Sequence, residues 1–294
     1  MKKIAIYSFS VLFFYGALGQ ERDSLDIMIG QMIQVGITDF NDPSVRKELR
    51  TLIKTDKVGG VILFEKNLQK ENKKSALSNL IQVLQKDAHI PLFIAIDEEG
   101  GYVNRLKPKY GFPKTVSAAY LGAMDDLDST KFYSAQTAQT LSSLGFNVNY
   151  APSVDVAVNP NNPVIVKNER SYSKDPKKVI RHASAYMEGH KPYDVATVLK
   201  HFPGHGSSQA DTHLGVADVS NSWQKKELDP FIELIKTGTV QAIMTAHIIN
   251  KNLDEDLFPA TLSKRIITDL LRKELGYDGV IFSDDMHMAA IIKN

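Results

Sequence analysis

Seven short apolar runs recur along the chain, and stretches with the spacing of amphipathic helices separate them. The apolar runs are near-continuous rather than alternating, which is typical of parallel strands covered on both faces. The predicted strands are residues 33–36, 60–64, 92–96, 147–151, 197–200, 242–245 and 279–283. The predicted helices are residues 24–32, 75–86, 129–144, 177–189, 224–236 and 263–275. Repeated strand–helix order predicts an α/β fold, either a barrel or a doubly wound sheet.

Polar residues directly follow five of the predicted strands. They are Asp97-Glu98-Glu99-Gly100-Gly101, Pro152-Ser153-Val154-Asp155, His201-Phe202-Pro203-Gly204-His205-Gly206, Ala246-His247 and Asp284-Asp285. An α/β barrel builds its active site from the carboxyl ends of many strands, whereas a doubly wound sheet concentrates it at one switch point. The spread over five strand ends therefore favours a TIM-like (β/α)8 barrel.

A closed barrel of this kind needs eight strands, and the sequence supplies seven before it stops at Asn294. We therefore expect this chain to lack the last strand and helix of the barrel. No Pro/Gly/Ser-rich linker or internal repeat divides the chain, so one domain over residues 20–294 is expected.

The first residues have the layout of a secretory signal peptide. Lys2 and Lys3 form a basic start, residues 4–18 are uncharged and mostly apolar, and Ala17 and Gly19 form a small-x-small cleavage site. This pattern predicts a signal peptide over residues 1–19 and an exported protein, periplasmic or secreted. The alternative is a short membrane anchor, although the run is short for a span. No later stretch is apolar for long enough to cross a membrane.

Charge and cysteine content exclude several classes of function. The 35 Lys and Arg residues almost balance the 34 Asp and Glu residues, so the basic excess of a nucleic-acid binder is missing. The absence of cysteine removes disulfides, thiolate nucleophiles, cysteine-based zinc sites and iron–sulfur clusters. The sequence also has no GxGxxG, Walker, GxSxG or zincin motif. We accordingly expect no metal and no cofactor.

The stretch 200–206 carries two histidines in a loop. Pro203, Gly204 and Gly206 are incompatible with a regular helix, so His201 and His205 are not a helical metal pair despite their spacing. Three interpretations stay open: structural histidines in a tight loop, a metal site completed by His213 and Asp211, or a catalytic or sugar-binding loop. In the last case Lys200 and His201 would supply hydrogen-bond donors.

Three further groups of residues could carry chemistry. Asp211 can accept a hydrogen bond from His213 and raise the pKa of its imidazole, although a solvated loop pair has the same sequence. Asp284 is placed as a nucleophile at a strand end, with helix capping as the alternative. Asp97 with Arg105, and Arg170 within residues 168–172, can bind hydroxyl groups or form surface turns.

Four motifs occur in a fixed order: Asp97-Glu98-Glu99-Gly100-Gly101-Tyr102-Val103-Asn104-Arg105, Asn168-Glu169-Arg170-Ser171-Tyr172, Lys200-His201-Phe202-Pro203-Gly204-His205-Gly206 with Asp211-Thr212-His213, and Ser283-Asp284-Asp285-Met286. This order closely resembles glycoside hydrolase family 3, and within it the bacterial β-N-acetylglucosaminidases. The resemblance runs from about Leu25 to the last residues. Residues 20–294 would then be the N-terminal barrel domain of that family. Tyr102 departs from the pattern, because many members carry Arg there.

The resemblance implies an enzyme that removes terminal β-linked N-acetylglucosamine with retention of configuration. Asp284 matches the nucleophile, His213 matches the acid/base, and Asp211 matches the dyad partner of that histidine. The positions that match sugar-contacting residues are Asp97, Arg105, Arg170, Lys200 and His201. The expected partner is an oligosaccharide or muropeptide substrate. Nothing in the sequence indicates an oligomeric state.

Several other functions fit part of the pattern. A β-glucosidase or β-xylosidase of the same family would place a carboxylic acid elsewhere, and the segment Asp211-Thr212-His213 speaks against it. An N-acetylglucosaminide phosphorylase is compatible with a neutral histidine base, which does not repel phosphate. A non-catalytic glycan-binding fragment and a metal-dependent hydrolase are the remaining alternatives.

Overall fold

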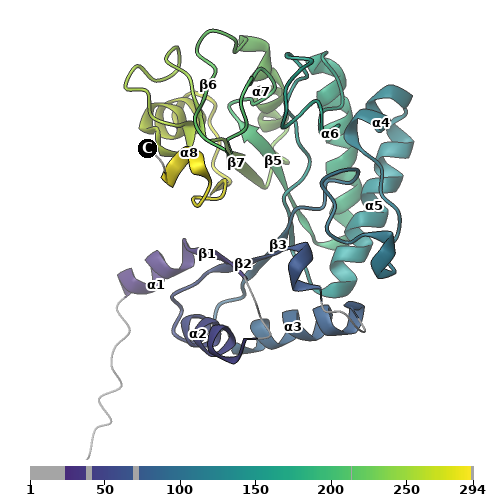
Figure 1. Cartoon of the computed structure of the whole chain (residues 1–294), viewed down its shortest axis with the longest axis vertical. Helices are drawn as coiled ribbons and strands as arrows, with labels where there is room; N and C mark the ends of the chain where they lie inside the picture. The colour runs from purple at the N-terminus through teal and green to yellow at the C-terminus, as the bar shows by residue number, and fades with distance from the viewer. Residues whose placement is uncertain (1–23, 38–41, 69–72, 213, 293–294) are drawn as a thin grey trace, which may run out of the picture.

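Seven parallel strands form one sheet that curls into part of a barrel (Figure 1). The computed structural model describes residues 24–37, 42–68, 73–212 and 214–292 of the chain. The predicted signal peptide and His213 lie outside these ranges. The strands are β1 (Gln34–Gly36), β2 (Gly60–Leu63), β3 (Phe93–Ile96), β4 (Val148–Asn149), β5 (Ala196–Phe202), β7 (Ala242–Thr245) and β9 (Val280–Ser283).

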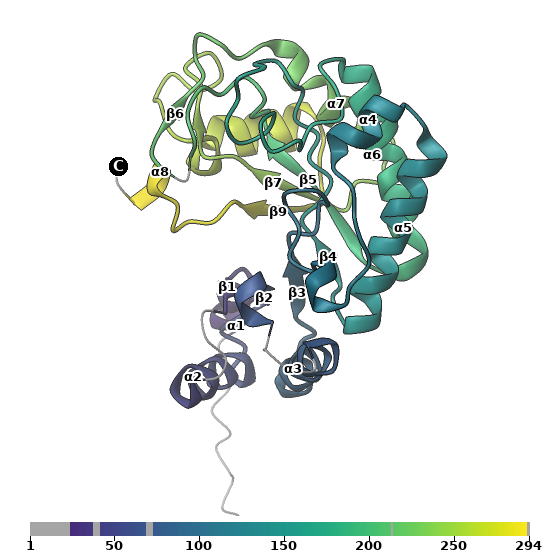
Figure 2. The same ribbon diagram turned by 45° about the vertical axis from the view of Figure 1, so that its right-hand side comes forward.

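The strands follow one another in the sheet in their order along the chain, β1-β2-β3-β4-β5-β7-β9, and each neighbouring pair is parallel. The sheet curves so that its two end strands, β1 and β9, turn toward each other (Figures 1 and 2). A second, two-stranded parallel sheet pairs β6 (Ala217–Asp218) with β8 (Ile248–Ile249). The α/β class and the curled parallel sheet agree with the sequence prediction.

Helices cover the outer side of the curled sheet (Figure 2). The helices are α1 (Ser24–Gln31), α2 (Pro43–Lys54), α3 (Lys73–Asp87), α4 (Ala118–Met124), α5 (Leu127–Leu144), α6 (Pro176–His190), α7 (Asp229–Lys236), η6 (Arg265–Glu274) and α8 (Ala289–Ile292). Single 3-10 turns are η1 (Glu65–Asn67), η2 (Pro108–Tyr110), η3 (Lys191–Tyr193), η4 (Lys225–Glu227) and η5 (Ala260–Leu262). Helix η6 is of the π type, and the Leu275 N–H donates to the Leu270 carbonyl, five residues back.

Two apolar clusters join the helices to the sheet. One packs α2, α3 and α5 on the first strands, with Ile53, Leu84 and Leu141 among its fully covered side chains. The other packs α6, α7 and η6 on β5 and β7 and includes Phe202 and Phe231, whose rings meet edge to face at 5.2 Å. Burial of such surface contributes about 25 cal/mol per Å2 of apolar area, so these contacts hold the strands in their curve.

A third cluster fills the concave side of the sheet, and it is built from inward side chains of β3, β4, β5 and β7. Phe282 on β9 reaches across it, with ring centroids 5.3 Å from Tyr150 and 5.9 Å from Phe93. The Tyr150 hydroxyl donates a hydrogen bond to the side-chain oxygen of Gln34 on β1. Distant strands therefore touch inside the curve, as expected for the packed interior of an α/β barrel.

The predicted elements needed three corrections. Strand β5 does not end at Lys200 but runs to Phe202, so His201 lies within the strand. The single helix predicted over residues 224–236 is wrong, because the chain forms the short turn η4 and then α7, which starts anew with Pro230 in its first turn. Helices α2 and α4 were not predicted. Helix α2 has a conventional start, since Asp42 accepts from the Ser44 N–H and Pro43 follows.

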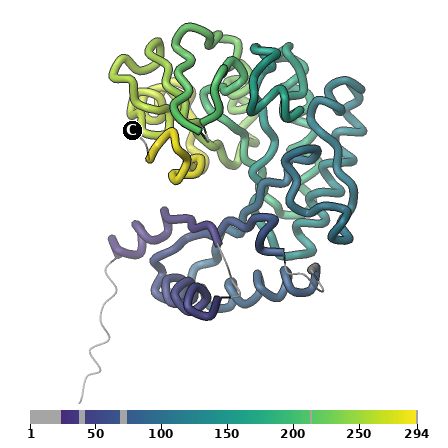
Figure 3. Tube along the Cα trace, viewed as in Figure 1, coloured from purple at the N-terminus to yellow at the C-terminus, as the bar shows by residue number. Residues whose placement is uncertain are grey.

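Because neighbouring strands of the sheet are parallel, their carboxyl ends and the loops that follow them lie at one edge of the sheet. The tube in Figure 3 shows that the chain passes from its first to its last described segments around one curve. Within the part of the chain that the structure describes, no helix combines the length and apolar character needed to cross a bilayer.

Candidate functional site

The strand register brings three predicted site segments to one edge of the sheet. Phe202 pairs with Thr245 across β5 and β7, and Thr245 pairs with Ser283 across β7 and β9. The Asp284 N–H then donates to the Thr245 carbonyl at 3.2 Å. Because neighbouring strands are about 4.8 Å apart, this ladder places Asp284 two strands from His201 and at the same level.

A buried lysine joins two acids that follow β3. The Lys200 ammonium lies 2.8 Å from a carboxylate oxygen of Asp97 and 2.7 Å from one of Glu99. Its side chain is 1% exposed, so nearly all of its charge is matched by these two groups rather than by water. An ammonium held by two carboxylates is fixed in position. Because it has three N–H donors, the third can donate to a hydroxyl group of a ligand.

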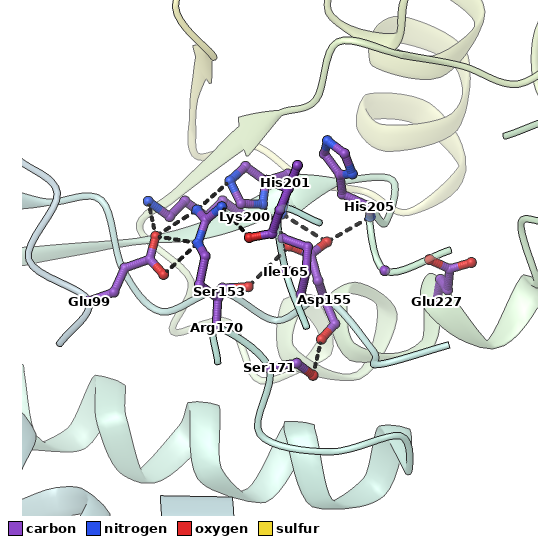
Figure 4. A network of polar contacts seen from close by, with 12 residues as sticks. Glu99, Ser153, Asp155, Ile165, Arg170, Ser171, Lys200, His201, His205 and Glu227 are labelled. Atoms are coloured by element: carbon purple, nitrogen blue, oxygen red, sulfur yellow. Dashed lines mark hydrogen bonds and ion pairs between the residues drawn. The ribbon is translucent and has the colours of Figure 1, made fainter. Parts of the chain in front are cut away.

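Arg170 joins the same cluster from the loop after β4. Its guanidinium binds Glu99 through two nitrogens, with Nη2 at 2.7 Å from Oε1 and Nε at 2.9 Å from Oε2. Nη2 also lies 3.0 Å from His201 Nε2. Since arginine can only donate, His201 Nε2 accepts, and the ring proton belongs on Nδ1. His201 therefore donates through Nδ1, to Asp155, and accepts through Nε2, from Arg170 (Figure 4).

Asp155 organises the histidines from beneath. Its side chain is fully buried, and its Oδ2 accepts from His201 Nδ1 at 2.6 Å and from the Ser153 hydroxyl at 3.1 Å. Its Oδ1 accepts the backbone N–H of His205 at 2.7 Å. One carboxylate thus sets both the ring of His201 and the path of the chain at His205 (Figure 4).

The charges of the cluster keep its acids ionised. Burial would raise the pKa of Asp97, but the charges of Lys200 and Arg105 outweigh it and hold that pKa below its usual value. Burial would likewise raise the pKa of Glu99, but the charges of Arg170 and Lys200 outweigh it and lower that pKa. A site of fixed, charged donors and acceptors is suited to a ligand rich in hydroxyl groups.

Arg105 reaches the cluster from a loop that Glu98 holds in place. The Arg105 guanidinium lies 3.4 Å from Asp97 Oδ2. Oε2 of Glu98 accepts the backbone N–H groups of Arg105 and Leu106 at 2.8 and 3.0 Å. Glu98 is 2% exposed, and burial raises its pKa to about 7 despite these two bonds.

Asp284 and the acid Asp97 of the lysine cluster both act electrostatically on Tyr150. Burial raises the pKa of Tyr150, and the charges of Asp97 and Asp284 raise it further, so this hydroxyl lies in the field of both carboxylates. Asp284 is partly exposed, and one of its oxygens accepts the Asp285 N–H at 2.8 Å. The predicted nucleophile and the predicted sugar-contacting residues therefore face one region.

The segment after β5 carries Asp211. The first residues of this segment, 205–207, form its root and are held tightly. Asn162 donates to the His205 carbonyl at 2.7 Å, and Glu227 accepts the Ser207 N–H at 3.0 Å. Asp211 itself is partly exposed and follows a short exposed stretch. The predicted acid/base, His213, lies outside the described residues.

A groove of about 580 Å3 opens beside the loop after β3. Its wall combines aromatic, small and charged residues: Gly101, Tyr102, Lys114, Thr115, Val116, Ser117, Tyr120, Tyr133 and Glu169. Tyr102, the position that departs from the family pattern, is 67% exposed here. Two residues of its wall are close in sequence to the lysine cluster: Gly101 follows Glu99 by two residues, and Glu169 directly precedes Arg170.

Over residues 24–37, 42–68, 73–212 and 214–292, no group of three His, Cys, Asp or Glu side chains is arranged to hold a metal ion. The donor pair predicted as part of a metal alternative, His201 and His205, is directed elsewhere. His201 Nδ1 bonds Asp155, and His205 Nε2 lies 3.4 Å from the Thr212 hydroxyl.

Sequence reasoning assigned no role to two residues of this site, Glu99 and Asp155. Both follow predicted strands, at the positions where an α/β barrel places functional groups. Strand-end position alone was therefore a usable signal. It did not show which of the adjacent acids Asp97, Glu98 and Glu99 would face the lysine.

The comparisons with known proteins agree on one family. The family described as "Glycosyl hydrolase family 3 N terminal domain" matches residues 24–294. A protein named beta-hexosaminidase A from Pseudoalteromonas piscicida is 41% identical over 263 residues, which cover 83% of this chain and 43% of that protein. The chain belongs to glycosyl hydrolase family 3, as the sequence motifs predicted.

Solved structures show the same fold. A glycoside hydrolase family 3 beta-N-acetylglucosaminidase from Paenibacillus sp. str. FPU-7 superposes with a TM-score of 0.84 at 37% identity, over 92% of this chain and 51% of that chain. NagZ from Neisseria gonorrhoeae, in complex with N-trifluoroacetyl-D-glucosamine, gives a TM-score of 0.77 at 29% identity, over 87% of this chain and 74% of that chain. The chain thus spans about half the length of the Pseudoalteromonas and Paenibacillus proteins.

Proposed function

We propose that the chain is the catalytic barrel domain of an exo-β-N-acetylglucosaminidase that acts with retention of configuration. The observation that supports the proposal is the strand ladder that brings Asp284, two strands away from His201, to the edge of the sheet that also carries the Lys200–Glu99–Arg170 cluster. The proteins named beta-hexosaminidase and beta-N-acetylglucosaminidase among its relatives support the choice of sugar.

In the proposed reaction the ionised Asp284 attacks the anomeric carbon, and the bond from that carbon to the departing oxygen breaks. A protonated His213, oriented by Asp211, gives its proton to the departing oxygen. Neutral His213 then takes a proton from water, which attacks the anomeric carbon, releases the sugar and restores the Asp284 carboxylate. The proposed sugar contacts are Asp97, Arg105, Arg170, Lys200 and His201.

The site explains why a sugar ring would be held during this sequence. Asp97 and Glu99 are acceptors with fixed positions, and Lys200, Arg105 and Arg170 are donors with fixed positions. Arrangement before binding lowers the entropy cost of orientation in the transition state. His201 contributes by fixing Arg170 through its acceptor nitrogen.

The proposed natural substrates are cell-wall fragments or chitin-type saccharides, reached after export directed by residues 1–19. Comparison of N-acetylglucosamine release from muropeptides and from chito-oligosaccharides tests the first part. The N-terminal sequence of the protein recovered from the culture fluid and the periplasm tests the second, and a retained Met1 at both places would contradict export by cleavage.

The central test offers aryl β-N-acetylglucosaminide and aryl β-glucoside to the protein, with and without phosphate. We expect hydrolysis of the first substrate, and nuclear magnetic resonance should show the β-anomer as the first product. Release of N-acetylglucosamine 1-phosphate in phosphate buffer would instead identify a phosphorylase. Faster turnover of the glucoside would contradict the choice of sugar.

A further inference from the structure

Thr212 is a buried residue in an exposed stretch. Of residues 209–212 and 214–216, it alone is buried, with 2% of its surface exposed. Leu214 is 76% exposed and Val216 is 38% exposed. A small polar side chain that is buried while its apolar neighbours face water is held there by specific contacts rather than by the hydrophobic effect.

Two contacts account for the burial of Thr212. Its hydroxyl lies 3.4 Å from Nε2 of His205, seven residues back along the chain. Its carbonyl accepts the N–H of Ala290 at 3.2 Å. Ala290 is the second residue of α8, which follows closely on Asp284. Thr212 therefore connects the segment of Asp211 to the segment of Asp284.

His205 is a firm point of attachment. Its N–H donates to Asp155 at 2.7 Å, its carbonyl accepts from Asn162 at 2.7 Å, and its ring is 1% exposed. Burial lowers the pKa of His205 to about 4, so the ring is neutral at pH 7. Nδ1 has no partner among the described residues, and an unpaired buried N–H is costly. The single ring proton therefore belongs on Nε2, facing the Thr212 hydroxyl.

The root of this segment leaves little freedom before residue 209. A Cβ added at Gly206 would lie 1.7 Å from the Val156 carbonyl, and Ser207 is bound to the buried Glu227. The exposed stretch that begins at Gln209 has no such enclosure. Thr212, the buried residue among residues 209–212, therefore contributes to the placement of this stretch.

We propose that Thr212 is a positioning residue, which uses its hydroxyl on His205 and its carbonyl on Ala290 to hold the segment that carries Asp211 near the segment that carries Asp284. The inference rests on the proposed function, because it concerns delivery of the proton to the leaving group. It adds a role for a residue that touches neither the sugar nor the reacting atoms. The His205 ring acts as the fixed end of this link.

The test compares Thr212→Val, which removes the hydroxyl and keeps the shape, with Thr212→Ser, which keeps the hydroxyl. Each variant is assayed for kcat/KM on two β-N-acetylglucosaminides, one with an alkyl leaving group and one with a dinitrophenyl leaving group. Departure of a basic alkoxide needs a proton from the enzyme, whereas departure of dinitrophenolate does not. Misplacement of the acid therefore changes the first rate and spares the second.

For Thr212→Val we expect about a tenfold loss in kcat/KM on the alkyl substrate and little change on the dinitrophenyl substrate. Thr212→Ser should stay close to wild type on both. Ala290→Pro removes the other contact at the first turn of a helix, where proline is tolerated, and should give the same selective loss. It keeps the proposal testable if Thr212→Val fails to fold.

Equal losses on the two substrates, or wild-type rates for both Thr212→Val and Ala290→Pro, would overturn the role of Thr212. In those outcomes an active wild-type protein leaves the proposed function standing. A wild-type protein that is inactive on both N-acetylglucosaminides would overturn the proposed function and this inference together.

Discussion

Asp155 and His201 are joined by a 2.6 Å contact between Oδ2 and Nδ1 at the floor of the site. This contact fixes which nitrogen of the imidazole carries the proton, namely Nδ1. It leaves Nε2 as the acceptor for Arg170 at 3.0 Å. The buried carboxylate of Asp155 therefore determines how the guanidinium of Arg170 is held.

Asp155→Asn should separate this role from simple packing. The amide must place an NH2 group against either His201 Nδ1 or the His205 N–H, which sets donor against donor. We expect about a hundredfold loss in kcat/KM and destabilisation of about 3 kcal/mol. Kinetics and urea unfolding measure the two effects, and the exposed Asp256→Asn is the control. Equal behaviour of the two variants would refute the assignment.

Glu98→Gln should change how stability depends on pH. Glu98 has a pKa raised to about 7. The folded protein therefore binds a proton that the unfolded chain releases near pH 4.5, so stability falls as pH rises from about 4.5 to about 7. The loss is about 3 kcal/mol above that window. Glutamine stays neutral, and its oxygen can accept both N–H groups that Oε2 now accepts.

Urea unfolding of wild type and Glu98→Gln at about pH 5 and about pH 8 measures this effect. We expect nearly equal stability at the lower pH and a more stable variant at the higher pH. The acids with lowered pKa, such as Asp97 and Glu99, contribute stability that is lost only at lower pH, and they cancel in the comparison. Parallel pH profiles would show that Glu98 is ionised in the folded protein at neutral pH.

Gly206→Ala tests the root of the segment that carries Asp211. Its Cβ would lie 1.7 Å from the Val156 carbonyl, whereas a Cβ at Gly215, on the same segment, meets nothing within 4 Å. We expect Gly206→Ala to cost about 1–3 kcal/mol and to lower kcat at least tenfold. Gly215→Ala should leave stability unchanged. Similar thermal unfolding and turnover for the two variants would argue against a rigid root.

Asp284→Ala should cause a larger loss of activity than Asp211→Asn. Loss of the nucleophile removes the covalent route, which we expect to lower kcat by about 10^4 or more. Loss of the Asp211 charge leaves the imidazole present but poorly oriented, with an expected loss of about 10^2. Steady-state kinetics on an aryl N-acetylglucosaminide measures both. Near-wild-type turnover in both variants would exclude the proposed mechanism.

The sequence by itself determined the order of the seven strands of the main sheet and the positions of the polar residues after them. Near-continuous apolar runs need cover on both faces, and this requirement alone leads to a parallel sheet with outer helices. The four ordered motifs also identified the family. The start of helix α2 at Asp42-Pro43 is also a signal that the local sequence carries, although the sequence prediction did not include this helix.

Tertiary structure alone decided which polar groups meet. Strand ends share one edge only after strands far apart in the sequence have paired in parallel, so the pairing of Lys200 with both Asp97 and Glu99 depends on contacts about a hundred residues apart. The orientation of His201 is set by Asp155, and the burial of Thr212 by His205 and Ala290. Local propensity carries no information on such pairs, because their energy comes from burial and charge brought together by the fold.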